Sequence, residues 1–76
     1  MSDPTTIAFD DYQGRETLAL LADGKPLQIT HVPGEIVRAL IARIRRSSPV
    51  PVYTGYRRMD GGERYTVAVW PAREGA

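Results

Sequence analysis

The sequence contains no cysteine, so disulfide bonds and thiolate metal sites are excluded and folding needs no oxidising compartment. A long apolar run is also missing, because the longest one, residues 18–22, is far shorter than the ~20 residues that span a bilayer. The chain starts with MSDPTT, which is polar and acidic, whereas a signal peptide starts with basic and then apolar residues. We therefore expect a cytoplasmic protein that does not insert into a membrane.

Residues that could catalyse a reaction are scarce. The one histidine, His31, is expected to be a half-exposed loop residue, and no second histidine is present to complete a metal pair. Asp10 and Asp11 are adjacent, so on a strand their carboxylates would point to opposite faces. No phosphate-binding loop with a GxxxxGKS or GxxxxGKT pattern occurs. We therefore predict that the protein is not an enzyme and holds no metal or cofactor.

The chain has 76 residues, the size of one small domain, and such a domain buries roughly 60% of its unfolded surface. We predict a single domain over residues 1–76, with residues 1–4 and 72–76 as tails. The net charge of +1 is unevenly spread: residues 1–37 carry two basic and six acidic groups, and residues 38–76 carry eight basic and three acidic groups. This asymmetry predicts a basic face formed by the second half of the chain.

The clearest periodic pattern lies in the middle of the chain and predicts a helix. Apolar residues recur there at helical spacing and form one stripe roughly 100° wide. They are Ile36, Val37, Leu40, Ile41 and Ile44. Gly34, after Pro33, is expected to be the N-cap. Arginines crowd the last turns, where cations suit the negative end of the helix dipole, and Pro49 stops the helix.

The rest of the chain is predicted to form short strands and turns. Apolar runs, alternation and turn residues indicate strands at residues 5–9, 16–22, 25–31, 50–56 and 63–70. Asp23-Gly24 fits the positive φ angles of a type I′ turn and predicts a hairpin between the second and third strands. A second hairpin turn is expected at residues 59–62. The predicted fold class is therefore α+β: an antiparallel sheet of two hairpins, (β)ββαββ, packed on one helix.

The second predicted strand is apolar on both faces, which is typical of a strand whose second face meets a partner. The candidates for this protein interface are Leu18, Leu20 and Leu21, with Arg57, Arg58 and Arg64 for polar recognition. The leading hypothesis is a non-catalytic protein-interaction or regulatory module that binds a larger assembly or pairs with itself as a homodimer.

The arginines also support a second hypothesis, a small nucleic-acid-binding domain. Basic groups interleaved with aromatic rings on a sheet are typical of platforms for single-stranded nucleic acid. The candidate residues are Arg45, Arg46, Arg57, Arg58, Tyr56 and Tyr65, with Tyr53 and Trp70 nearby. The near-neutral net charge and the lack of an RNP-like run weigh against it.

Two further hypotheses fit a chain of this size. One is a ubiquitin-like β-grasp module, although the terminus Glu74-Gly75-Ala76 lacks the final Gly-Gly that conjugation requires. The other is a small phage-encoded or secreted inhibitor of host machinery. Both remain open on the sequence alone.

Several short segments carry a resemblance when they are taken in order. They are residues 7–12 (IAFDDY), 20–24 (LLADG), 32–33 (VP), 39–45 (ALIARIR) and 57–64 (RRMDGGER). This order resembles the N-terminal PAS-like subdomain of the type II secretion and type IV pilus assembly ATPases, which precedes their RecA-like motor core. The resemblance spans residues 7–70 and implies a regulatory module whose partner is a secretion or pilus motor ATPase.

The chain departs from that family at one strand. The family carries alternating arginines before the Asp-Gly turn, some of which approach the nucleotide of the motor core, whereas this chain has Thr17, Ala19 and Leu21 there. The Walker motifs, the Asp box and the His box of the motor have no counterpart. The resemblance therefore implies a stand-alone copy that does not contact nucleotide. The apolar replacements would favour self-association or docking on a motor subunit.

Overall fold

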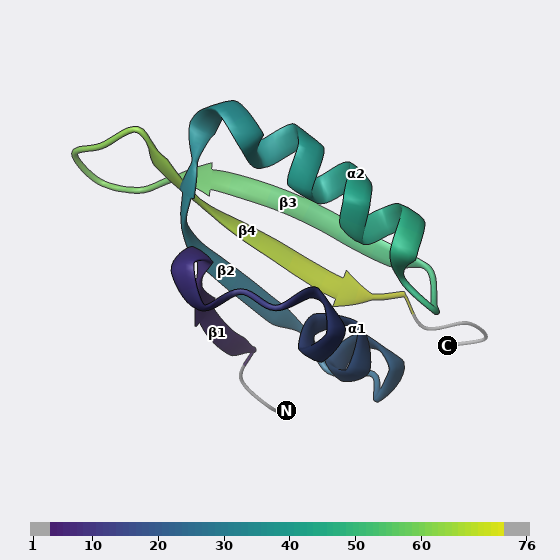
Figure 1. The fold of residues 1–76 in the computed structure, drawn as a ribbon. Helices are drawn as coiled ribbons and strands as arrows, with labels where there is room; N and C mark the ends of the chain where they lie inside the picture. The colour runs from purple at the N-terminus through teal and green to yellow at the C-terminus, as the bar shows by residue number, and fades with distance from the viewer. Residues whose placement is uncertain (1–3, 73–76) are drawn as a thin grey trace.

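The structure, a computed structural model, describes residues 4–72 (Figure 1). The predicted tails lie largely outside this range. The elements in chain order are β1 (Thr5–Ala8), the 3-10 turn η1 (Phe9–Asp11), α1 (Gly14–Ala22), β2 (Leu27–Pro33), the 3-10 turn η2 (Gly34–Ile36), α2 (Val37–Ser47), β3 (Val52–Arg58) and β4 (Arg64–Pro71). No helix in this part of the chain has the length and apolar character needed to cross a membrane.

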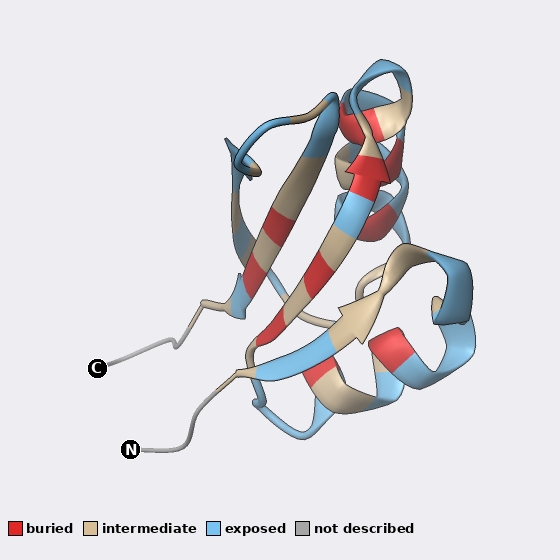
Figure 2. Ribbon diagram, turned by 90° about the vertical axis from the view of Figure 1, so that its left-hand side faces the viewer, coloured by how far each residue is buried: buried red, intermediate tan, exposed pale blue. Residues whose placement is uncertain are grey.

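The four strands form one mixed sheet in the order β1-β2-β4-β3. β1 pairs with β2 in parallel, whereas β4 is antiparallel to both β2 and β3. β1, β2 and β3 therefore run in one direction, and each of the first two connections is a crossover through a helix. Crossovers between parallel strands are right-handed. Because both crossovers move the chain in the same direction across the sheet, both helices lie on the same face. Figure 2 shows α1 and α2 on the same side of the sheet.

The α+β class is confirmed, but the predicted sheet of two antiparallel hairpins is wrong. Within residues 4–72 only β3 and β4 form a hairpin. The first predicted hairpin fails because its first strand, residues 16–22, belongs to α1. Thr17 and Leu21, four residues apart, are both fully buried, and Leu20 packs against the core, which is the spacing of one helical face. Leucine and alanine also favour a helix over a strand.

Asp23-Gly24 ends this helix and is not a hairpin turn. Gly24 has a φ of 77°, so the predicted positive φ is confirmed. The residue caps the end of a helix, however, and does not form a hairpin turn. Its amide donates to the carbonyl of Leu21 and the amide of Lys25 donates to the carbonyl of Leu20, each over 3.0 Å. This pair of bonds is the Schellman motif, which satisfies the last carbonyls of a helix.

The central helix is confirmed, with a corrected start. Val37, Leu40 and Ile44 are buried in α2, as the apolar stripe predicts. Gly34 is not its N-cap, because η2 comes first and the cap position falls on Ile36. Gly34 instead allows a close approach of two segments. A Cβ atom there would lie 2.9 Å from Cε1 of Tyr65, and its amide donates to the carbonyl of Glu63 over 3.0 Å.

A bulge interrupts β2 near its end. The register with β4 shifts between Ile29 and Val32, and His31 within this shift has a φ of 60°. The His31 amide donates to Sδ of Met59 over 3.3 Å, so the bulge contacts the end of the β3–β4 hairpin. His31 is exposed, and because β2 continues two residues past the predicted end of this strand, His31 is a strand residue and not a loop residue.

The core lies between the sheet and the two helices (Figure 2). Its buried apolar residues are Leu21, Leu27, Ile29, Val32, Val37, Leu40, Ile44, Val67 and Val69. The one buried polar side chain among residues 4–72 is Thr17, whose hydroxyl donates to the carbonyl of Gln13 over 3.1 Å. The helices thus cover one face of the sheet, and no helix within the described part of the chain covers the other.

Candidate binding surfaces

The four strands share an unusual charge distribution. None of them contains an aspartate or glutamate, whereas they carry His31, Arg57, Arg58 and Arg64. The acidic residues between positions 4 and 72 lie instead in helices, 3-10 turns and connections. Because strand residues make up both the sheet face and its edges, these surfaces suit anionic ligands.

The face that no helix covers, here called the helix-free face, can be assigned from the strand register. Val67 and Val69 of β4 point to the helices, so Trp70 and its partner on β3, Tyr53, point the other way. Trp70 is 47% exposed and Tyr53 is 66% exposed. Arg57 lies on the same face of β3, four residues after Tyr53. Alternation also places Arg64 on this face, where β4 begins. Other positions on the face are small or uncharged: Thr6, Ala8, Gln28, Thr30, Gly55, Thr66 and Ala68.

A second surface lies along the outer edge of the sheet. The side chains of β3 and α2 line a groove of about 400 Å³, here called the β3–α2 groove. From α2 come Arg38, Ile41, Ala42 and Arg45, and from β3 come Thr54, Gly55 and Tyr56. The lining thus combines an apolar centre with two guanidinium groups and contains no carboxylate.

Among residues 4–72, no strand pairs with the backbone of β3 on the side of this groove, because β3 is the last strand of the sheet. The amide of Met59 donates to the carbonyl of Arg64 over 2.9 Å, and the amide of Ala72 donates to the carbonyl of Pro51 over 2.8 Å. Hydrogen-bonded pairs alternate along an antiparallel ladder, so the intervening odd-numbered residues also face β4. The backbone N–H and C=O groups of Thr54 and Tyr56 therefore point outward.

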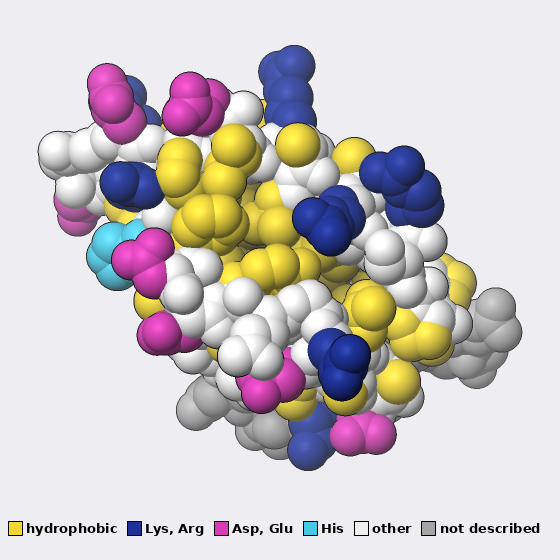
Figure 3. Space-filling view, in the orientation of Figure 1, with side chains coloured by type: hydrophobic (Ala, Val, Ile, Leu, Met, Phe, Trp, Pro, Cys, Tyr) yellow, Lys and Arg dark blue, Asp and Glu magenta, His cyan; other side chains and the backbone are white. Residues whose placement is uncertain are grey.

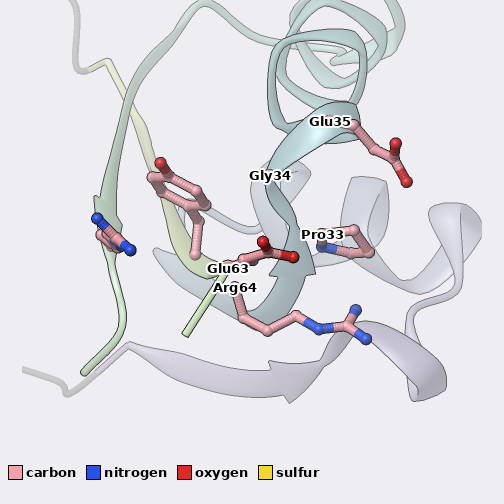
Figure 4. A pocket seen from close by; sticks show the side chains of 7 residues that line it. Pro33, Gly34, Glu35, Glu63 and Arg64 are labelled. Atoms are coloured by element: carbon pink, nitrogen blue, oxygen red, sulfur yellow. The ribbon is translucent and has the colours of Figure 1, made fainter. Parts of the chain in front are cut away.

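A third hollow opens at the end of the sheet where β4 begins, with a volume of about 590 Å³. Its lining residues are Pro33, Gly34, Glu35, Arg58, Glu63, Arg64 and Tyr65. Nε of Arg58 donates to the carbonyl of Gly62 over 3.0 Å, and Nη1 of Arg64 lies 3.5 Å from the carbonyl of His31. Figure 4 shows the charged tips spread around the rim, without convergence on one point. The hollow therefore presents mixed charge without a focused anion or cation site.

A smaller apolar hollow lies on the helix-covered side, between α2 and the segment around η1. Figure 3 shows hydrophobic side chains gathered in the middle of that side. The hollow has a volume of about 250 Å³ and is lined by Phe9, Tyr12, Ile36, Ala39, Leu40 and Arg43. Phe9 and Tyr12 stack with their ring centroids 6.5 Å apart. These residues flank the core and partly close it, which accounts for their apolar character.

The residues proposed from the sequence as a protein interface do not form one surface. Leu21 is fully buried, Leu20 packs against the core, and Leu18 is half-buried on α1. Leu21 is therefore a core residue and drops out of any docking surface. Arg57 and Arg58 end β3, at the opposite end of the molecule from α1 (Figure 1), and Arg64 begins β4 at that same end.

The residues proposed as a nucleic-acid site are also divided. Tyr56 and Tyr65 pack edge to face on the helix-covered side, with ring centroids 5.8 Å apart. Arg45 lines the β3–α2 groove and Arg46 is exposed in the last turn of α2. Arg58 lies at the end hollow, so only Arg57 belongs to the helix-free face.

The sites proposed from the sequence leave out Arg38 and name Tyr53 and Trp70 only as neighbours of the arginines, whereas these surfaces include all three. Strand alternation alone could have placed Trp70 opposite Val67 and Val69. It could not have shown that no helix covers that face, because that depends on the handedness of both crossovers.

The comparisons with known proteins add no relative. No protein-family model matches the chain, and neither the curated proteins nor the solved structures include a significant match. Among residues 4–72, no three histidine, cysteine, aspartate or glutamate residues lie close enough to hold a metal ion.

Proposed function

We propose that this protein is a non-catalytic interaction module that accepts an extended segment of a partner protein along the free edge of β3. The supporting observation is that one strand offers outward N–H and C=O groups and a lined groove together. Thr54 and Tyr56 supply both, since their backbone faces outward while their side chains line the β3–α2 groove. Addition of a strand to such an edge is a recurrent mode of peptide recognition.

The groove also defines the chemistry of the added segment. Arg38 and Arg45 are seven residues apart on α2, about 10 Å along its axis, with the apolar Ile41 and Ala42 between them. Alternate residues of a strand face the same side, and positions i and i+4 are about 13 Å apart. A segment with acidic residues at i and i+4 and an apolar residue at i+2 would therefore match the groove.

A second copy of this chain matches the groove less well. It would bring the same arginines against each other without a carboxylate to pair with, and like charges in contact are unfavourable. The module is therefore expected to be a monomer that binds a different protein. The resemblance to secretion and pilus ATPase subdomains makes a motor subunit of that kind one partner to test.

The edge can be tested with a fluorescein-labelled peptide, Thr-Glu-Thr-Val-Thr-Glu-Thr, titrated with the protein by fluorescence anisotropy. Thr54→Pro removes one outward N–H and places a ring at the edge, while the hydrogen bonds from β3 to β4 are retained. We expect the peptide to bind at least about ten-fold more weakly. One backbone hydrogen bond is lost directly, and the proline ring keeps the added strand from approaching its neighbours. Thr54→Val is the matched control, since it keeps the N–H and the side-chain shape, and it should bind normally.

Charge provides the second arm of the test. The double variant Arg38→Glu, Arg45→Glu should lose the acidic peptide and gain affinity for a version with lysine in place of glutamate. Equal binding of both peptides to the parent protein, or normal binding by Thr54→Pro with native circular dichroism, would show that the edge is not the site. A dimer of the parent that Thr54→Pro dissociates would show instead that a second copy occupies the edge.

A further inference from the structure

The helix-free face, which the proposed function does not use, presents two aromatic rings side by side. Tyr53 and Trp70 are directly opposed in the β3–β4 register, and both are about half exposed or more. The Trp70 ring reaches over Gly55, where an added Cβ would lie 4.0 Å from Cζ3. The glycine thus leaves room for the indole to lie toward the sheet. Two large rings on a small-residue sheet form a platform on which planar groups can stack.

The charge of this face selects an anionic ligand. Arg57 shares the face with Tyr53 and lies four residues along β3, at about 13 Å. No carboxylate lies on the strands that build the face. The positions around the rings are threonine, glutamine, alanine and glycine, so a large apolar partner would find little to bury. The ligand that fits carries a planar aromatic group for the two rings and an anionic group for Arg57.

We infer that the helix-free face binds single-stranded nucleic acid, with bases stacked on Trp70 and Tyr53 and a phosphate held by Arg57. Stacking requires bases that are free of a duplex, because a flat sheet reaches the faces of bases only when they are unpaired. Stacking on aromatic rings tolerates any base, so the preference is for single strands and not for a sequence. This set of residues shares only Arg57 with the set that the sequence suggests, and it lies on one face.

Trp70 makes the inference directly measurable, because it is the one tryptophan of the chain. We would titrate the protein with a 15-nucleotide oligothymidylate and follow Trp70 emission in 20 mM and 200 mM NaCl. We expect saturable quenching as a base stacks on the indole. A duplex of the same length should quench far less. Neutralisation of one or two phosphates predicts a slope of log K against log salt between about −0.7 and −1.4.

Variants identify the surface, with anisotropy of a labelled oligothymidylate as the second readout. Trp70→Ala should weaken binding about ten-fold, since loss of one base–aromatic stack has roughly that effect, and Trp70→Phe should retain much of it. Arg57→Ala should weaken binding and flatten the salt dependence. Arg43→Ala removes the same charge from α2, on the helix-covered side, and should change nothing.

These outcomes also separate this inference from the peptide site. Arg38→Glu, Arg45→Glu should abolish peptide binding and leave quenching of Trp70 in place, because the two surfaces lie on different sides of the sheet. The inference is overturned if no quenching occurs at low salt, if duplex quenches as well as single strand, or if Arg43→Ala weakens binding as much as Arg57→Ala. Circular dichroism of each variant checks that the fold is retained.

Discussion

Truncation of Leu21 tests whether residues 14–22 form a helix packed on the core. Leu21 is fully buried between α1 and the sheet, whereas Leu18 on the same helix is half-buried. Leu21→Ala and Leu18→Ala remove the same atoms and keep the helix propensity of the segment high. Any difference in stability between the two variants therefore comes from how each leucine is packed, because the chemical change is the same.

The magnitude follows from burial. A buried leucine replaced by alanine loses about 3 kcal/mol, which combines the transfer of the side chain and the cavity left behind. A domain of this size is expected to have a free energy of unfolding of roughly 4–11 kcal/mol. Leu21→Ala should therefore remove about a quarter or more of the stability. Leu18→Ala should lose less than about 1 kcal/mol, because its side chain is only partly buried.

Urea denaturation followed by far-UV circular dichroism measures both values. With a slope of about 1 kcal/mol per molar urea, Leu21→Ala should lower the midpoint by about 3 M and Leu18→Ala by less than 1 M. Equal losses for the two variants would contradict the helical packing. A Leu21→Ala protein as stable as the parent would place this side chain outside the core and restore it as a surface candidate.

Substitutions at two glycines test the local geometry around the helices. Gly24→Ala should cost about 1 kcal/mol in the same urea experiment, because alanine tolerates a φ of 77° poorly, and Gly24→Asn should cost less since asparagine adopts this conformation more readily. Gly34→Ala should destabilise by about 1–3 kcal/mol, because its Cβ would lie 2.9 Å from the Tyr65 ring. A Gly34→Ala protein of parental stability would contradict this close packing.

The two proposed surfaces share β3 but use different groups of that strand. Tyr53 and Arg57 face the helix-free side, whereas Thr54 and Tyr56 face α2. Because strand side chains alternate, a substitution on one side leaves the other side's chemistry in place. The peptide and oligonucleotide tests can therefore fail or succeed independently.

Some elements were predictable because their pattern is long and regular. The apolar stripe from Ile36 to Ile44 recurs over more than two turns, and only a helix brings its members to one face. In β4 the alternation of Val67 and Val69 with Thr66 and Ala68 likewise indicates the buried face. Residues 18–22 are different, because a short run of leucine and alanine fits a buried strand and a buried helix equally well by pattern.

Local sequence therefore decided α2, the β3–β4 hairpin and the position of the left-handed glycine at Gly24. Tertiary structure decided that α1 is a helix, since Thr17, Leu20 and Leu21 can face the core together in a helix, whereas a strand would turn Leu20 to the opposite face. It also decided the strand order, which inserts β4 between β2 and β3. The exposed Tyr53–Trp70 pair and the free β3 edge follow from that order and from the two same-handed crossovers. Such features depend on contacts between distant segments, and no window of sequence contains them.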